Sequence, residues 1–285
     1  MAEAIIYMND ESIDQKTFDL LLNTIYQQYG YDFREYAQTS LKRRFAGILF
    51  RYNIATLKAC QHRITQDPAF FTAVLSELTI TVTELFRDPY AYVGIKGHVF
   101  PYLKTCPHFK IWHAGCATGE EVYSLAILLT EDELYERAII YATDINLKAL
   151  YDARLGLLSN EAIRQGTSNY FEAGGKASLS QYLISNNSHT LLSAQLKSHV
   201  VFSDHNLVSD SCFGEMQFVL CRNVMIYFNK ELQARVLKLL TNSLCLGGYL
   251  CLGSKESLSF SSVEKQYERV DARARIYRKI RGESS

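Results

Sequence analysis

The sequence predicts an α/β protein in which a mostly parallel sheet, with helices on both faces, follows an all-helical region. Short apolar runs alternate with segments of helical periodicity after about residue 110, which is typical of repeated strand–helix–strand units. Before about residue 80, apolar residues recur at helical spacing. The 285 residues suffice for two modest domains, each with its own core. We therefore expect a helical domain over 1–80 and an α/β domain over 81–285.

The charge balance and the cysteine content exclude several classes of protein. Lys and Arg together number 30, as do Asp and Glu, so no overall field favours nucleic acid or an anionic membrane. No apolar run is long enough to span a bilayer and the N-terminus lacks the layout of a signal peptide, so we expect a cytoplasmic protein without membrane insertion. The seven cysteines lack paired Cys-x-x-Cys spacing, which indicates reduced thiols and no metal site.

Two helices are predicted near the N-terminus. Apolar residues at i, i+3, i+4 and i+7 predict the first over about 15–28, and a second is expected over about 33–51. The second also carries a basic cluster, which consists of Lys42, Arg43, Arg44 and Arg51. These cations either form a solvated helix face or dock an acidic partner.

A further helix start and a connector follow. Asp67-Pro68 places an N-cap before a proline in the first turn of a helix. Residues 79–89 are rich in β-branched residues and are expected to form an extended connector between the domains. Arg87 lies next to an apolar pair in this connector. It is either a surface charge or an inward-pointing group whose planar fork suits a carboxylate.

Residues 110–129 are the most informative stretch, because they predict a strand, a tight turn and a helix. Gly115 and Gly119 permit a close approach of a ligand to the main chain, and the helix start offers unpaired N–H groups. Glu120 and Glu121 in the first turn would repel a pyrophosphate, and the spacing is not the Gly-x-Gly-x-x-Gly of dinucleotide sites. The pattern favours a phosphate-free cofactor with a positive centre, such as S-adenosylmethionine. The alternative is a purely structural turn.

The next segments supply a second polar strand end and an insertion. Residues 139–144 predict a buried strand that ends on Asp144, whose carboxylate can accept both ribose hydroxyls of an adenosine. A crossover helix is expected over 147–154. The Ser-, Asn- and Gly-rich residues 165–198 predict a small antiparallel β insertion with a turn at Asn186-Asn187.

The rest of the chain continues the α/β pattern. Strands are predicted over 199–202, 217–221 and 249–253, a helix over 230–242, and an antiparallel pair over 266–270 and 275–280. Because carboxyl ends of parallel strands meet at one edge of a sheet, we expect the polar loops after the strands to line one crevice. These loops are Gly115–Glu121, Asp144, Asn206-Leu207 and Arg222-Asn223. Cys116 and Cys221 lie in or beside them, where a small buried thiol is commoner than a nucleophile.

Taken together, these motifs resemble the chemotaxis receptor protein-glutamate O-methyltransferase family, usually called CheR. The similarity covers nearly the whole chain and rests on Thr83-x-x-Phe86-Arg87, Gly115–Ser124, Ala142–Ile145, Asn206-Leu207, Cys221–Phe228, and Gly247-Gly248 with Gly253–Leu258. It implies a Rossmann-like class I methyltransferase sheet with a small antiparallel β insertion, preceded by an all-α N-terminal domain.

The resemblance also implies an activity, which is S-adenosylmethionine-dependent methyl esterification of glutamate side chains on chemotaxis receptor helices, with S-adenosylhomocysteine as product. It implies cofactor contacts from Thr81, Thr83, Arg87, Gly115, Glu120 or Glu121, Asp144, Asn206, Leu207, Arg222 and Asn223. Arg87 would hold a carboxylate, and Tyr227 would lie beside the transferred methyl unless it is simply a core aromatic. No general base is needed, because glutamate with a pKa of about 4.3 is already ionised at neutral pH.

The implied partner is the cytoplasmic domain of a methyl-accepting receptor. Acidic receptor helices would face the basic cluster of the second helix, which is Lys42, Arg43, Arg44 and Arg51. The β insertion could bind a receptor C-terminal tail peptide by strand addition.

Three positions depart from the family pattern. Thr81 stands where the family has Asn, Leu85 replaces an aromatic residue, and Lys255 replaces Ser. They indicate a divergent member and leave two other hypotheses open, which are a non-catalytic S-adenosylmethionine-binding adaptor and a methyltransferase with a non-receptor substrate. An amino- or nucleic-acid methyltransferase is disfavoured, because the loop after 217–221 lacks an Asp/Asn-Pro-Pro-Tyr-type sequence.

Overall fold

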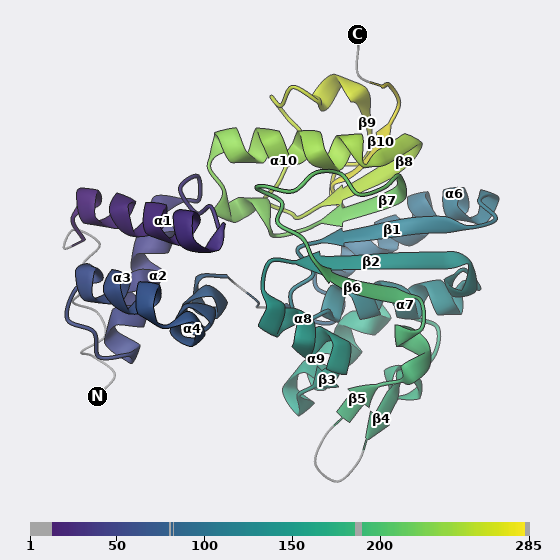
Figure 1. The fold of residues 1–285 in the computed structure, drawn as a ribbon. Helices are drawn as coiled ribbons and strands as arrows, with labels where there is room; N and C mark the ends of the chain where they lie inside the picture. The colour runs from purple at the N-terminus through teal and green to yellow at the C-terminus, as the bar shows by residue number, and fades with distance from the viewer. Residues whose placement is uncertain (1–12, 80, 82, 186–189, 283–285) are drawn as a thin grey trace. The chain divides into compact units, whose positions relative to one another are not determined.

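The computed structural model describes residues 13–79, 81, 83–185 and 190–282 (Figure 1). The chain divides into two compact units. The first comprises Met1–Ile80 with Tyr227–Gln233, and the second comprises Thr81–Ile226 with Ala234–Ser285. A short segment late in the chain, 227–233, is therefore part of the helical unit.

The N-terminal part of the first unit is helical. Its helices are α1 (Gln15–Tyr29), α2 (Gln38–Arg51), α3 (Leu57–Gln66) and α4 (Pro68–Leu78). Side-chain oxygens of Asp14, Thr56 and Asp67 cap α1, α3 and α4 by accepting backbone N–H groups of the first turn. The apolar stripes of the four helices share one core. The predicted first helix and the helix start at Asp67-Pro68 are confirmed, whereas α3 was not predicted as a separate helix.

The predicted helix over 33–51 begins later, as α2, because the residues before it pair with a distant part of the chain. Tyr36 forms an antiparallel bridge with Phe228. The Ala37 N–H donates to the Tyr227 carbonyl over 2.8 Å. This pairing ties segment 227–233 to the first unit.

The second unit is built on a seven-stranded sheet in the order β6-β2-β1-β7-β8-β10-β9. Its strands are β1 (Phe109–Ala114), β2 (Ala138–Asp144), β6 (Val200–Asp204), β7 (Met216–Cys221), β8 (Leu244–Leu252), β9 (Tyr267–Asp271) and β10 (Ile276–Lys279). The five strands from β6 to β8 run parallel, and β10 pairs antiparallel with β8 and β9. The predicted mostly parallel sheet and its antiparallel C-terminal pair are confirmed.

The helices of the second unit lie on both faces of this sheet. They are α5 (Pro89–Gly94), a π-helical turn (Ile95–Val99), α6 (Phe100–Thr105), α7 (Glu120–Glu131), α8 (Leu147–Leu155), α9 (Asn160–Glu172) and α10 (Lys230–Asn242). The connections through α7 and α8 step in one direction along the sheet and that through α10 steps in the other. Right-handed crossovers therefore place α7 and α8 opposite α10, as Figure 1 shows. Helices α5 and α6 were not predicted.

Helix α7 is the centre of the core. Every residue from 122 to 129 is buried, and this helix shares one hydrophobic core with the large aromatic side chains of Tyr92, Phe100 and Phe109. Burial of this kind is the main source of folding free energy and fixes the start of α7 against the ends of the strands.

Two segments of the second unit differ from the predictions. Residues 165–172 belong to α9, which Ser159 caps through the Ala162 N–H, so the insertion is not all β. A three-stranded antiparallel sheet in the order β3-β5-β4 does form, from Leu157–Leu158, Thr190–Leu192 and Leu183–Ser185. The predicted Asn186-Asn187 turn lies outside the described residues.

Strand β8 begins at Leu244, before the glycine pair that was predicted to precede it. Gly247 adopts φ +83°, and the pairing of β7 with β8 shifts register between Met216 and Phe218. The strand carries the glycines as a local irregularity instead of starting after them.

Candidate cofactor site at the carboxyl ends of the strands

The turn after β1 is held by its neighbour β2 and needs glycine at both ends. Gly115 and Gly119 adopt φ values of +80° and +90°. The N–H groups of Gly115 and Cys116 both donate to the Thr143 carbonyl, over 2.8 and 2.9 Å. A Cβ on Gly115 would lie 2.5 Å from Val224 Cγ2. The turn is therefore packed directly against the loop that follows β7.

Asp144 joins three of the predicted loops. One of its carboxylate oxygens accepts the Ala117 N–H over 2.8 Å, and the other accepts the Asn146 N–H over 2.9 Å. The Asp144 carbonyl accepts the His205 N–H over 3.3 Å, which brings the loop after β6 to the same place. Burial raises the pKa of Asp144 above its usual value, and the backbone donors offset part of that shift.

Glu121 is the counter-ion of a buried arginine. Its Oε2 lies 2.7 Å from Arg222 Nη1, and its Oε1 lies 3.3 Å from His113 Nδ1. Arg222 also donates to Asp88 Oδ2 over 2.9 Å and to the Arg87 carbonyl over 3.2 Å, with a side chain only 1% exposed. Burial opposes ionisation of Glu121, but Arg222 and His113 together hold its pKa below the ordinary value.

The adjacent Glu120 has different surroundings. Its Oε2 accepts a hydrogen bond from the Thr118 hydroxyl over 2.7 Å, and no cation among the described residues pairs with it. Burial raises the pKa of Glu120, and the Thr118 hydrogen bond opposes that shift. Of the two carboxylates, Glu120 has more bonding capacity left for a ligand, because each oxygen of Glu121 already has a partner.

The connector before α5 is held tightly against α7. Phe86 and Asp88 have positive φ values of 53° and 55°, which cost energy for residues of this kind. The Phe86 N–H donates to Ser124 Oγ over 2.8 Å, and Ser124 Oγ in turn donates to the Glu120 carbonyl over 2.6 Å. Arg87, between the two strained residues, is half-buried, as are Thr81 and Thr83 upstream.

Glu256 organises the loop that carries Asn223, and sequence reasoning missed it as a site residue. Its carboxylate accepts four backbone N–H groups at 2.7 to 3.0 Å, from Gly253, Asn223, Val224 and Met225. The residue is 5% exposed. Burial raises its pKa, and the four backbone donors oppose that shift. Asn223 itself has φ +61°. The available signal was a Gly-x-x-Glu sequence directly after a predicted strand.

Asn206 and Leu207 are half-buried in the loop after β6. The Asn206 side-chain oxygen accepts the Val208 N–H over 3.0 Å, and its N–H donates to Asp210 Oδ2 over 2.8 Å, so the residue shapes its own turn. With this loop, the segments after β1, β2, β6 and β7 lie at one edge of the parallel sheet. The predicted convergence of the polar loops is confirmed.

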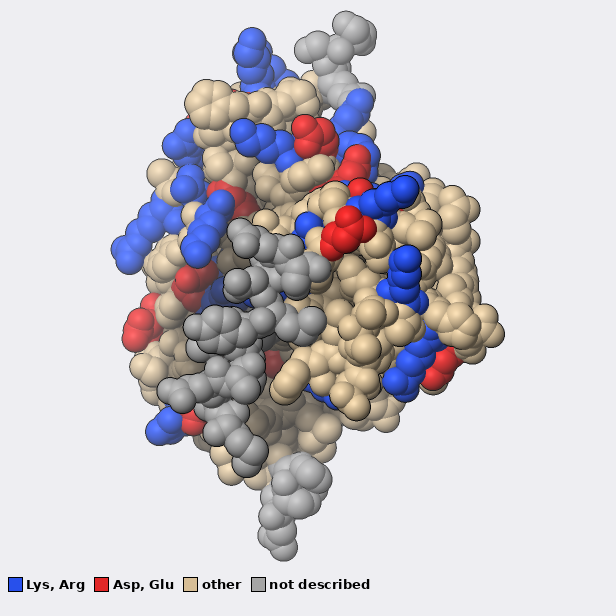
Figure 2. Space-filling model, turned by 90° about the vertical axis from the view of Figure 1, so that its left-hand side faces the viewer, with Lys and Arg blue, Asp and Glu red and all other residues tan. Residues whose placement is uncertain are grey.

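The basic cluster of α2 is not uniform. Arg43 and Arg51 are exposed, and Lys42 is half-buried with its ammonium 5.7 Å from the centre of the Phe18 ring. Arg44 is half-buried, and its guanidinium lies 5.4 Å from the centre of the Tyr227 ring. Figure 2 shows both basic and acidic side chains on the face that it draws, which agrees with the balanced net charge.

Other features of the described residues carry no chemistry at this edge. Cys116 and Cys221 are buried and burial raises the pKa of both thiols, which disfavours a nucleophilic role. The seven cysteines are all free, and no cluster of ligands suited to a metal ion occurs among the described residues. In the same part of the chain, no helix has the length and apolarity to cross a membrane.

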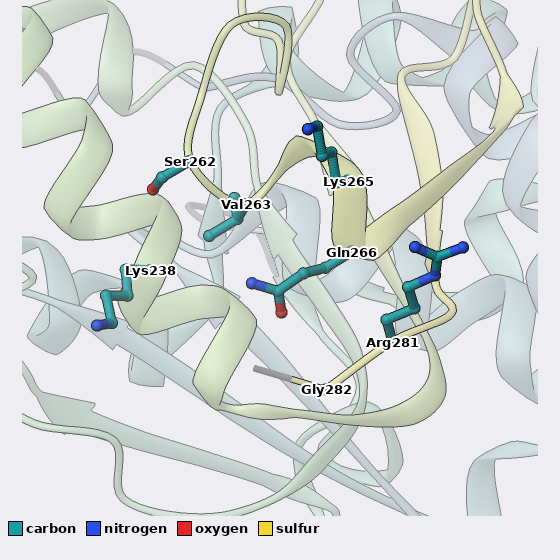
Figure 3. Close-up of a pocket in the computed structure, with 7 residues that line it drawn as sticks. All are labelled: Lys238, Ser262, Val263, Lys265, Gln266, Arg281 and Gly282. Carbon is teal, nitrogen blue, oxygen red and sulfur yellow. The ribbon is translucent and has the colours of Figure 1, made fainter. Parts of the chain in front are cut away.

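A surface hollow of about 480 Å³ lies elsewhere in the second unit (Figure 3). Its lining comes from α10 and the segment before β9 together with the C-terminal residues, namely Lys238, Ser262, Val263, Lys265, Gln266, Arg281 and Gly282. Gln266 points into the hollow, whereas the charged ends of Lys265 and Arg281 point away from it. None of the predicted cofactor residues lines this hollow.

Comparison with known families identifies the family of the chain and its cofactor. The family model described as CheR methyltransferase, SAM binding domain, matches residues 81–276. The model described as CheR methyltransferase, all-alpha domain, matches residues 16–79. The chain belongs to the CheR methyltransferase family. Its cofactor is S-adenosylmethionine.

Individual relatives agree with this assignment. The chain is 46% identical over 260 residues to Cher3 of Pseudomonas putida, which is provisionally named a methyltransferase, and the match covers 91% of this chain and 95% of that one. It is 30% identical over 238 residues to chemotaxis protein methyltransferase 1 of Pseudomonas aeruginosa, covering 78% of this chain and 83% of that one.

The residues present fit this cofactor. Asp144 ends β2 and Glu120 begins α7, and their carboxylates suit ribose hydroxyls and an ammonium group. The buried cation of these loops, Arg222, is already paired with two carboxylates of the chain, those of Glu121 and Asp88. This donor set favours a cationic cofactor without phosphates, as the sequence predicted.

Proposed function

We propose that this CheR-family methyltransferase esterifies glutamate side chains on the cytoplasmic domain of a chemotaxis receptor. The observation that carries the proposal is the carboxylate-lined edge of the sheet within a chain whose two parts match the two CheR domain models. Relatives named chemotaxis protein methyltransferases support a receptor substrate.

We assign the cofactor contacts as follows. Asp144 takes the ribose, and Glu120 takes the ammonium group because both oxygens of Glu121 already have partners. Arg87 holds a carboxylate of the cofactor or of the substrate. The remaining contacts come from Thr81, Thr83, Gly115, Asn206, Leu207 and Asn223, with Arg222 acting through Glu121 and the Arg87 carbonyl.

The reaction needs no general base from the protein. The cofactor supplies a methyl group activated by its sulfonium centre. The substrate carboxylate is already ionised near neutral pH, so the chain has to align it and to exclude competing water. In this proposal Tyr227 lies beside the methyl group and packs against the reacting atoms.

Two surfaces would bind the receptor. Arg43 and Arg51 present exposed cations on α2 to acidic receptor helices. In the β3-β5-β4 sheet, β4 is an outer strand and its Ile184 is 55% exposed, which suits addition of a receptor tail peptide as a further strand.

The test is transfer of a radiolabelled methyl group from S-adenosylmethionine to a purified receptor cytoplasmic fragment. We expect label that alkali releases as methanol, because glutamate methyl esters are base-labile, and no transfer by Asp144→Ala. Label on the fragment that resists alkali would indicate a different acceptor. Micromolar binding of S-adenosylhomocysteine with no transfer to any receptor fragment would support the adaptor hypothesis, for which Thr81 and Lys255 leave room.

A further inference from the structure

The tyrosine assigned to methyl transfer is seated in the helical unit, although it comes from the chain of the second unit. Segment 227–233 belongs to the first unit. The Tyr227 carbonyl accepts the Ala37 N–H over 2.8 Å, and two residues on, the Asn229 N–H donates to the Glu35 carbonyl over 2.9 Å. These bonds fix the backbone that directly follows the ring.

The ring itself is covered by Arg44. The guanidinium carbon lies 5.4 Å from the centre of the Tyr227 ring, within the range of a cation–π contact. Arg44 Nη1 also donates to the Leu78 carbonyl at the end of α4, so the guanidinium is held between a helix end and the ring. Burial lowers the pKa of Arg44, which marks a partly desolvated cation.

Arg44 thus differs from Arg43 and Arg51 of the basic cluster. Arg43 and Arg51 are exposed on the same helix, and Arg51 makes its ion pair with Glu77 at 3.2 Å in a solvent-facing position. The Arg44 guanidinium already lies over the Tyr227 ring and donates one N–H to Leu78, both in its own unit. A side chain committed in this way is poorly suited to contact a receptor directly.

We propose that Arg44 is a positioning residue that holds the Tyr227 ring in the orientation used for methyl transfer. The inference rests on the proposed function, which gives Tyr227 its role. Arg44 touches neither substrate nor cofactor in this account and acts only through the ring. Lysine cannot replace it, because a single ammonium on a flexible stem cannot hold both the ring and the Leu78 carbonyl as the guanidinium does.

The first test compares Arg44→Lys with a matched control. Arg63→Lys removes an arginine of the same unit whose guanidinium lies 4.2 Å from the centre of the Phe70 ring. The aromatic partner of Arg63 is therefore not Tyr227. With a receptor cytoplasmic fragment as substrate, we expect Arg44→Lys to lower kcat about tenfold and to leave KM and the affinity for S-adenosylhomocysteine unchanged. Arg63→Lys should change none of these three quantities. In a Tyr227→Ala background, the effect of Arg44→Lys should shrink to less than about twofold, because the ring it positions is gone.

The second test needs no activity. In protein labelled with ¹³C-tyrosine, the Tyr227 ring signal is assigned by its loss in Tyr227→Phe. We expect Arg44→Lys to shift that signal and Arg63→Lys to leave it in place. A wild-type protein that binds S-adenosylhomocysteine but methylates no receptor would contradict the proposed function. The ring signal would still show whether Arg44 holds the Tyr227 ring in place.

Two results would overturn the inference. One is a Tyr227 signal that Arg44→Lys leaves unchanged. The other is a raised KM with normal kcat in Arg44→Lys, which would make Arg44 a substrate-binding residue like its neighbours.

Discussion

The loops at the carboxyl ends of the strands and the outer face of α2 use the same residue types in opposite ways. In the loops, the Arg222 side chain is 1% exposed and bonded to Glu121 and Asp88. On α2, the Arg51 side chain is 69% exposed and pairs with Glu77 at 3.2 Å. A buried charge must be matched by its partners, whereas an exposed one is matched by water. Substitutions in the first region should therefore affect folding and cofactor binding together, and those in the second should affect only encounters with a partner.

The largest effect is expected at Arg222. Arg222→Met leaves the Glu121 carboxylate buried without its main counter-charge, so the free energy of unfolding should fall by about 3–5 kcal/mol. Urea denaturation followed by circular dichroism measures it. Adding Glu121→Gln to Arg222→Met should recover part of the loss. A double variant less stable than the sum of the two single changes would contradict the pairing.

The pH dependence of stability should separate Glu121 from Glu120. The pKa of Glu121 is held below its ordinary value of 4.5, so its contribution is present above pH 4.5 and is lost as pH falls through the lower folded-state pKa. The pKa of Glu120 is raised above 4.5, so ionising it destabilises the fold as pH rises through the higher folded-state pKa.

We therefore expect Glu121→Gln to be less stable than wild type at neutral pH, with the gap closing in acid. Glu120→Gln should be more stable than wild type at neutral pH, and this gap should also close below pH 4.5. Denaturation curves collected from pH 3 to 7 measure both. Parallel curves for wild type and either variant would show that the two carboxylates are not distinguished in this way.

Substitution of Glu256 should lower both the stability of the fold and the affinity for the cofactor product, with a smaller effect on stability than at Arg222. Glu256→Gln replaces a four-acceptor carboxylate by a group with one acceptor oxygen, so at least one buried N–H of the loop loses its bond, at a cost of about 1–3 kcal/mol. Because the same bonds hold Asn223, affinity for S-adenosylhomocysteine should fall about tenfold in calorimetric titration. Lys255→Ala, at the exposed neighbouring position, is the control and should change neither quantity. Unchanged affinity in Glu256→Gln would separate this loop from cofactor binding.

The sequence predicted the parts of this comparison that local patterns determine. The turn from Gly115 to Gly119 could be recognised because only glycine tolerates both positive φ values and the approach of Val224. The strands were recognisable as short apolar runs, and Asp144 followed from its place at a strand end. These signals lie within a few residues of one another in the chain.

Features created by long-range pairing could not be predicted in the same way. Glu256 accepts hydrogen bonds from backbone N–H groups about thirty positions earlier in the chain, and no local sequence pattern predicts these bonds. Helix α9 buries only Gly166 and Tyr170, so its apolar signal is weak and its polar composition suggested a loop. The late start of α2 depends on the pairing of Tyr36 with Phe228.

The smallest effect on stability is expected on the outer face of α2, where the comparison can be broken most directly. Arg43→Ala and Arg51→Ala should change the free energy of unfolding by no more than about 0.5 kcal/mol, because exposed charges and surface ion pairs contribute little. Both should nevertheless raise KM for a receptor cytoplasmic fragment severalfold at low salt, and the difference from wild type should fade as ionic strength rises and screening shortens the range of the attraction. Steady-state methylation at several salt concentrations measures this. A loss of stability comparable to that of Arg222→Met would mean that α2 carries structural charges as the loops do, and a KM that salt does not influence would place the receptor on another face.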